Sequence, residues 1–193
     1  MIDPTAVTNY NRTDAELEEL MLFSIAVAGK TAQVVSKQLQ TLLDAAPGSS
    51  PFDKIKKLTK NGKLLAALKK SRLGKYGILI KAYPQVTAFN LRTCTADELE
   101  TVHGIGPKTA RFFLLHSRPG IQVAALDTHI LKFLKALGHD VPDSTPTGKK
   151  YKLLEAVFIE EAKKRGRSIA ELDLAIWNHY SKGGDKSRQN PVF

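Results

Sequence analysis

The sequence predicts an all-α fold, and three observations support this. Apolar residues recur at spacings of three and four along most of the chain, the period of a helix with one buried face. A Ser or Thr followed three residues later by Glu, a pairing that caps helix starts, occurs at residues 13–16, 95–98 and 168–171. No segment shows the alternation of apolar and polar residues that is typical of a half-buried strand.

Composition limits the class of protein. With 193 residues, 42% of them hydrophobic, the chain is long enough for one substantial core or two small lobes. Its formal net charge of +10 predicts a polyanionic partner, and ordinary solubility charge is the alternative. The single cysteine, Cys94, excludes an intramolecular disulfide and a four-cysteine zinc or iron–sulfur site. Because no run reaches transmembrane length and no secretory signal begins the chain, we expect an intracellular protein with no bound metal or cofactor.

The first third of the chain predicts consecutive helices. Residues 1–12 are expected to be an irregular lead-in to a helix that is almost entirely apolar in its later turns. Gly29 and Lys30 interrupt this helix, and helical spacing resumes from residue 31. After a loop at residues 46–51, Ser50 and Pro51 fit the cap and the first position of the next helix.

The next segment is strongly basic. Residues 54–96 contain no Asp or Glu, whereas a solvated surface normally mixes both signs of charge. This bias predicts a surface that contacts DNA phosphates. The candidate contacts within it are Lys69, Lys70, Arg72, Lys75 and Tyr76. In the glycine-punctuated loop 71–77, Leu73 and Tyr76 are candidates for a wedge that enters a base stack, and simple anchoring of the loop is the alternative.

A hairpin between two short helices follows at residues 95–118. Gly104 and Gly106 stop the first helix, and Pro107 provides the backbone angle favoured at the start of the second. We expect both glycines to adopt backbone angles that a side chain would forbid, and to let main-chain N–H groups approach an anion closely. A DNA phosphodiester is the natural ligand, with His103 beside it, and an ordinary turn between helices is the alternative.

Two residues near the hairpin are candidates for chemistry. Lys108 lies in the first turn of a helix, where the helix dipole and any desolvation favour the neutral amine that a nucleophile needs. Asp127 is expected to cap the helix that begins after it, which would hold its carboxylate close to backbone donors. A purely structural capping role for Asp127 is the alternative.

These residues carry a family resemblance. The segment VHGIGPKTA, followed 19 positions after its lysine by LDTHI, resembles the helix-hairpin-helix DNA glycosylases, the superfamily of endonuclease III and the 8-oxoguanine glycosylases. In that family the lysine at the position of Lys108 attacks C1′ of the damaged nucleotide, and the aspartate at the position of Asp127 assists departure of the base. The chain lacks the C-terminal cysteine cluster of the endonuclease III branch. It also carries the family's lysine–alanine pair at a displaced position, Lys81 and Ala82.

The resemblance implies two helical lobes with a DNA-binding cleft between them. One lobe would be discontinuous, residues 1–29 and 137–193, and the other would be residues 30–136 with the hairpin motif at 95–118. Some family members place residues near the extruded base at the break after the first helix. Lys30 and Gln33 are the candidates there, and a plain helix corner is the alternative.

The C-terminal part adds few candidates. His129 is expected to point away from Asp127, as a supporting or core histidine. Trp177 could stack on a base or belong to the core. The segment from Ser168 also resembles the archaeal-type 8-oxoguanine glycosylases, and the polar ending 185–193 is expected to be ordered only against DNA or the rest of the fold.

The resemblance therefore predicts a monomeric base-excision enzyme that acts on double-stranded DNA containing a damaged base or an abasic site. It would combine glycosylase and AP lyase activities, with 8-oxoguanine favoured over oxidised pyrimidines. Two alternatives remain at this stage: a non-catalytic, structure-specific DNA-binding protein, and a glycosylase whose lysine is idle.

Overall fold

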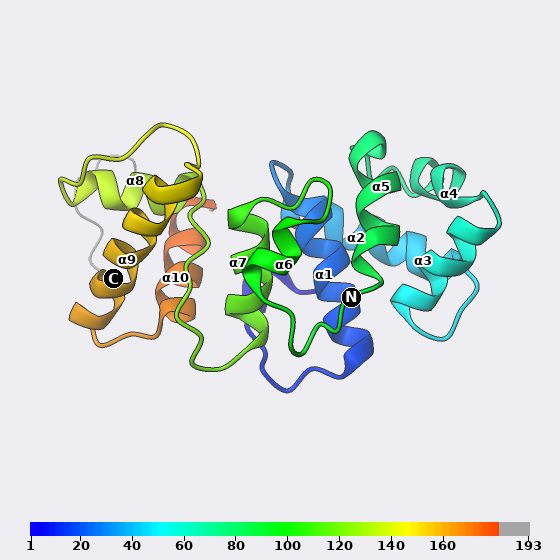
Figure 1. The fold of residues 1–193 in the computed structure, drawn as a ribbon, viewed down its shortest axis with the longest axis horizontal. Helices are drawn as coiled ribbons and strands as arrows, with labels where there is room; N and C mark the ends of the chain where they lie inside the picture. The colour runs from blue at the N-terminus through cyan, green and yellow to red at the C-terminus, as the bar shows by residue number, and fades with distance from the viewer. Residues whose placement is uncertain (182–193) are drawn as a thin grey trace.

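The computed structural model describes residues 1–181, and these are all-helical, as the sequence predicted (Figure 1). In chain order the elements are η1 (Pro4–Ala6), α1 (Asp14–Val27), α2 (Ala32–Ala45), α3 (Pro51–Lys60), α4 (Leu64–Lys70), α5 (Tyr76–Val86), α6 (Ala96–Glu100), α7 (Pro107–Ser117), α8 (Thr128–Ala136), α9 (Gly148–Lys164) and α10 (Ile169–Ser181). The polar ending 185–193 lies outside the described residues. Within residues 1–181 no helix is long and apolar enough to cross a membrane.

The helix starts follow local signals in the sequence. All three predicted capping boxes form, because in each the hydroxyl accepts the N–H of the Glu while the carboxylate accepts the N–H of the Ser or Thr. Ser50 caps α3 ahead of Pro51, and Asp127 caps α8, both as predicted. The pairing of side chains with otherwise unsatisfied backbone groups therefore fixes where these helices begin.

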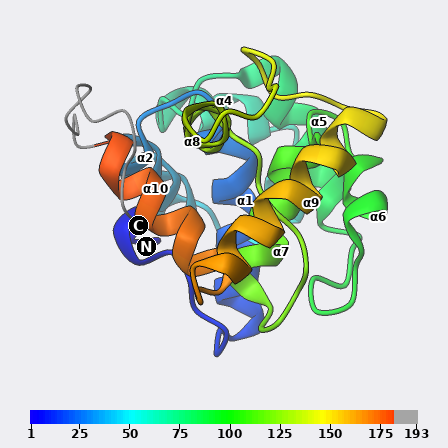
Figure 2. The same ribbon diagram turned by 90° about the vertical axis from the view of Figure 1, so that its left-hand side faces the viewer.

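Two hydrophobic cores meet along α7. The first extends from Ile2 to Leu114 and contains the nearly apolar α1, which packs against α2, α3, α5 and α7. The second extends from Leu115 to Ile176 and joins α8, α9 and α10. In Figure 1 these three helices lie at one end of the molecule and α3, α4 and α5 at the other, and Figure 2 views the α8–α10 end. Because α7 contributes to both cores, it links the two halves of the fold.

The boundary between the cores differs from the predicted lobe boundaries. It falls at residues 114 and 115, inside α7, and not near residues 29 and 136. The physical reason is that the later turns of α1 are buried on all sides among the helices that follow it, so α1 packs mainly with those helices. The lobe assignment itself stays a prediction.

Candidate active site and nucleic-acid interface

The turn between α6 and α7 is anchored by buried apolar residues and is exposed at His103. Leu99, Val102 and Ile105 are buried, and the Ile105 N–H donates to the Val102 carbonyl at 3.0 Å. Between them His103 is exposed, and its backbone N–H donates to the Gln85 side chain on α5 at 2.8 Å. The hairpin therefore presents its backbone to solvent while its apolar residues fix it on the fold.

The two hairpin glycines differ in backbone conformation and in the space around them. Gly104 has φ of +81°, and a Cβ at this position would overlap the Ile78 side chain of α5. Gly106 has φ of −98°, which any residue adopts, so the expected special backbone angle is wrong for this glycine. A Cβ on Gly106 would meet nothing within 4 Å. The open space leaves room for a group outside the protein to approach the chain.

The first turn of α7 has the features of an anion site. Gly106 is the N-cap and supplies no side-chain hydrogen bond, and Pro107 at the first position has no N–H. The next backbone N–H groups, on Lys108 and Thr109, therefore lack a capping side chain. Such uncapped donors at the positive end of a helix favour a phosphate.

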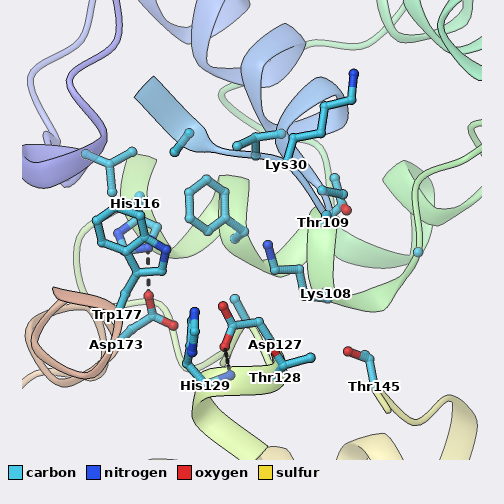
Figure 3. Close-up of a pocket in the computed structure, with 18 of the residues that line it drawn as sticks. Lys30, Lys108, Thr109, His116, Asp127, Thr128, His129, Thr145, Asp173 and Trp177 are labelled. Carbon is cyan, nitrogen blue, oxygen red and sulfur yellow. Dashed lines mark hydrogen bonds and ion pairs between the residues drawn. The ribbon is translucent and has the colours of Figure 1, made fainter. Parts of the chain in front are cut away.

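Lys108 also points into a pocket of about 700 Å³ (Figure 3). Six segments distant in sequence line it: the N-terminal segment, α1 with the α1–α2 corner, α7 from its N-cap to its third turn, residues 125–129, residues 145–147, and α10. The Lys108 ammonium lies 4.8 Å from the centre of the Phe112 ring, one turn further along α7. The pocket thus lies where the two cores meet, because both contribute to its wall.

Asp127 enters the same pocket from the opposite wall. Its Oδ1 accepts the N–H groups of His129 and Ile130 at 2.8 and 3.0 Å, which caps α8 and fixes the carboxylate. In Figure 3 the Lys108 amine and the Asp127 carboxylate project into one shared space. The structure therefore brings together the two residues that the sequence singled out for chemistry.

The environment perturbs the Asp127 carboxyl. Burial raises its pKa above the ordinary value, and the neighbouring Asp173 carboxylate raises the pKa further. The Lys108 ammonium and the Ile130 N–H act in the opposite direction. Asp127 consequently takes up a proton at a higher pH than an exposed aspartate does.

Asp173 itself is part of a buried polar chain. It lies on α10 and is 7% exposed, and its Oδ2 is 3.2 Å from Nε2 of the fully buried His116 on α7. The other ring nitrogen of His116 is 2.8 Å from the Thr8 hydroxyl of the N-terminal segment. This chain fixes one oxygen of Asp173 and leaves the carboxylate at the pocket wall (Figure 3).

His129 does not point away from Asp127. It lines the same pocket, and its ring stacks on Tyr180 of α10 with 5.6 Å between ring centres. The helical spacing argument fails here because Asp127 is the N-cap, which lies outside the helix and has extended backbone angles. The buried Nδ1 of His129 has no hydrogen-bond partner among the described residues.

Of the three candidates for the base pocket, two line the pocket and one does not. Trp177 lines the pocket from α10 and is only half-buried. Lys30 also lines it, but Figure 3 shows its amine directed away from the space between Lys108 and Asp127. The prediction for Gln33 is corrected: it is exposed and outside the pocket lining, because the first turn of α2 buries Ala32 and turns Gln33 to solvent.

Two lysines brace the loops beside this pocket. The Lys30 ammonium donates to the Leu73 carbonyl, and the Lys75 ammonium donates to the Ala28 carbonyl. Burial lowers the pKa of both lysines, and for Lys75 the nearby ammonium groups of Lys30 and Lys108 lower the pKa further. Lys75, expected to contact DNA, therefore ties the α4–α5 loop to the α1–α2 corner.

The remaining basic candidates are exposed. Lys69, Lys70 and Arg72 face solvent at the end of α4, where lysines also complement the helix dipole. Leu73 is fully buried in the first core, so it anchors the loop and is not a wedge. Tyr76 is half-buried against the same core.

The sequence reasoning missed Phe112, His116 and Asp173. Phe112 follows Lys108 by four residues, and Asp173 precedes Trp177 by four, so each shares a helix face with a residue already singled out. This four-residue spacing could have identified Phe112 and Asp173 from the sequence. His116 carried none, because its partners Thr8 and Asp173 lie far away in the sequence.

Comparison with known proteins identifies the hairpin. A family model described as the helix-hairpin-helix motif matches residues 90–115, which include α6, the exposed turn and most of α7. The chain therefore carries a helix-hairpin-helix motif, an element that binds DNA through backbone N–H groups at a helix start. No solved structure matches the chain. Within residues 1–181 no group of three or more His, Cys, Asp or Glu side chains could hold a metal ion.

Proposed function

We propose that this protein is a DNA glycosylase with AP lyase activity that excises an oxidised base from double-stranded DNA. One observation carries the proposal: Lys108, in the first turn of the second helix of the motif, and the half-buried Asp127 project into one pocket of about 700 Å³. The same helix start offers uncapped N–H groups to a phosphate. A nucleotide whose phosphate binds there has its sugar within reach of the pocket.

The chemistry follows from these two residues. The damaged nucleotide is extruded from the duplex into the pocket, at a cost of a few kcal/mol that is smaller for a lesion than for an intact pair. As the bond from C1′ to the base breaks, the base leaves with the bonding electrons, and the Asp127 carboxylate stabilises the positive charge that develops on the sugar. The Lys108 nitrogen then forms a bond to C1′ with its lone pair.

Strand scission completes the reaction. Loss of a proton from the attacking amine and opening of the sugar ring give a Schiff base between Lys108 and C1′. Removal of a proton from C2′ then expels the phosphate at C3′, which breaks the DNA strand by β-elimination. Water hydrolyses the Schiff base and releases the lysine.

The pocket wall favours a purine with N–H groups on its edge. Phe112 and Trp177 are half-buried aromatic side chains of the lining, so both have ring surface available for a base. Asp173 has a carboxylate at the wall, a pure acceptor of hydrogen bonds when ionised. A guanine-type base presents adjacent N–H donors on its Watson–Crick edge, which supports 8-oxoguanine over oxidised pyrimidines.

A second candidate function is non-catalytic, structure-specific DNA binding. It is favoured by the extent of the family match, which is confined to residues 90–115 and does not reach Asp127. In that case the N–H groups of α7 would bind phosphate and the pocket would hold no nucleotide.

A covalent trapping experiment separates the two. The protein is incubated with borohydride and a duplex containing either 8-oxoguanine or an abasic site, and the cross-linked complex is resolved by denaturing electrophoresis. The enzyme gives a stable complex and a nicked strand, and Lys108→Gln abolishes both while DNA affinity stays within a few-fold. Lys132→Gln removes an exposed lysine of α8 and is the matched control, with trapping unchanged. Absence of trapping by the wild-type protein refutes the lyase, and base release without trapping indicates a glycosylase whose lysine is idle.

A further inference from the structure

A buried arginine connects three helices behind the candidate site. Arg111 lies on α7, three residues after Lys108, with its side chain only 8% exposed. Its Nη1 donates to Glu100 on α6 at 2.5 Å, and its Nε donates to Glu155 on α9 at 2.8 Å. The guanidinium also lies 4.8 Å from the centre of the Tyr151 ring of α9.

The segment that leads to Asp127 depends on the same two α9 side chains. Residues 121–126 belong to no helix, so their backbone groups need partners from elsewhere. The Ala124 N–H donates to Glu155 at 2.9 Å, and the Ala124 carbonyl accepts the Tyr151 hydroxyl at 2.7 Å. The same hydroxyl accepts the Leu126 N–H at 3.1 Å. The backbone immediately before Asp127 is therefore fixed by Glu155 and Tyr151.

One atom joins the two halves of this network. Oε1 of Glu155 accepts hydrogen bonds from both Arg111 Nε and Ala124 N–H. Arg111 is about one helical turn from Lys108, and Ala124 is three residues from Asp127. This carboxylate thus connects the helix that carries Lys108 to the segment that leads to Asp127.

We propose that Arg111 is a positioning residue that holds Asp127 in register with Lys108, an inference that rests on the proposed function. A buried ion pair contributes little net stability, because desolvation offsets most of the attraction. The planar guanidinium, in contrast, fixes direction: it donates to carboxylates on two different helices at set angles. Misplacing a catalytic group by about 1 Å costs on the order of 100-fold in rate, so such a link has a kinetic effect larger than its effect on stability.

The test variant is Arg111→Met combined with Glu155→Gln. Removing the arginine alone would leave the Glu155 carboxylate buried and unpaired and would destabilise the fold, whereas the double change removes both charges of this pair and leaves only the more exposed Glu100 without the arginine. The amide oxygen introduced by Glu155→Gln can still accept the Ala124 N–H, so residues 121–126 keep this acceptor while Arg111 loses its bonds to α9 and to α6. The matched control is Arg165→Met with Glu161→Gln, an ion pair between α9 and its C-cap residue, whose arginine also lies over an aromatic ring but has no bond to residues 121–126.

Two activities are compared on the same preparations. Excision of 8-oxoguanine requires the Asp127 carboxylate beside the bond that breaks, whereas nicking of a ready-made abasic duplex requires Lys108 without departure of a base. We expect excision by the double variant to fall about 10- to 100-fold and nicking to stay within about threefold of wild type. The control variant should keep both excision and nicking at wild-type rates. If excision and nicking fall in proportion, or if neither falls, Arg111 does not position Asp127.

A second measurement does not depend on activity. Amide hydrogen exchange at Ala124 and Leu126 should quicken in the double variant while the buried turns of α9 keep their protection. Unchanged exchange at residues 121–126 overturns the positioning role. Should the wild-type protein cleave neither duplex, the proposed function fails, and exchange still decides whether Arg111 orders the segment before Asp127.

Discussion

Asp127 has two separable roles, and one pair of variants distinguishes them. Asp127→Asn and Asp127→Ala both remove the charge from the pocket, but asparagine caps a helix about as well as aspartate does and alanine does not. The side chain accepts two backbone N–H groups at the start of α8, at 2.8 and 3.0 Å. Loss of such a cap costs about 0.5–2 kcal/mol, so we expect the alanine variant to be about 1 kcal/mol less stable than the asparagine variant.

The change in stability and the change in excision rate are both large enough to measure. For a chain of this size 1 kcal/mol corresponds to roughly 2–4 °C in melting temperature, followed by circular dichroism. Loss of the charge that faces the developing positive sugar should reduce single-turnover excision of 8-oxoguanine by about 100- to 1000-fold in both variants. Nicking of a ready-made abasic duplex should stay within about threefold of wild type.

Two results would refute this reasoning. Excision by Asp127→Asn at the wild-type rate would mean that the carboxylate carries no transition-state charge and serves only as a cap. Equal melting temperatures for the two variants would mean that the hydrogen bonds to His129 and Ile130 do not stabilise α8.

Three further predictions concern the pocket, the hairpin and the basic tract. The excision rate should fall as the pH drops through the pKa of Asp127, and Asp173→Asn removes a carboxylate that raises this pKa, so the fall should move to a lower pH. An acidic limb of the pH profile that does not move would contradict the effect of Asp173 on the pKa of Asp127. Gly104→Ala should lower the melting temperature, since it combines a positive φ with overlap against α5 and costs about 1–2 kcal/mol from the φ alone; Gly106→Ala should leave it unchanged but weaken DNA binding. Reversing the two lysines at 69–70 to glutamate should reduce the slope of log affinity against log salt by about 0.9 for each phosphate that is no longer neutralised, equally for damaged and undamaged duplexes; an unchanged slope means that DNA lies elsewhere.

Features that depend on neighbouring residues could be predicted from the sequence. The three capping boxes, the Ser50 cap ahead of Pro51 and the Asp127 cap each pair groups two or three residues apart, so their geometry follows from local backbone conformation. The same holds for the helix-hairpin-helix segment at residues 90–115, whose glycines, proline and following lysine lie within one short stretch. All-α architecture follows because helical periodicity is itself a local pattern.

Contacts between side chains that are distant in the sequence depend on how the helices pack. The burial of Leu73, the outward position of Gln33 and the brace between Lys30 and the α4–α5 loop depend on how helices pack, which spacing does not specify. The pairing of His116 with Asp173 joins residues 57 positions apart. The hydrogen bond from Arg111 to Glu155 joins residues 44 positions apart, and Glu155 also binds the segment before Asp127. Contacts between residues this far apart in the sequence depend on how the two cores pack along α7, so local sequence patterns do not specify the partner of each polar group.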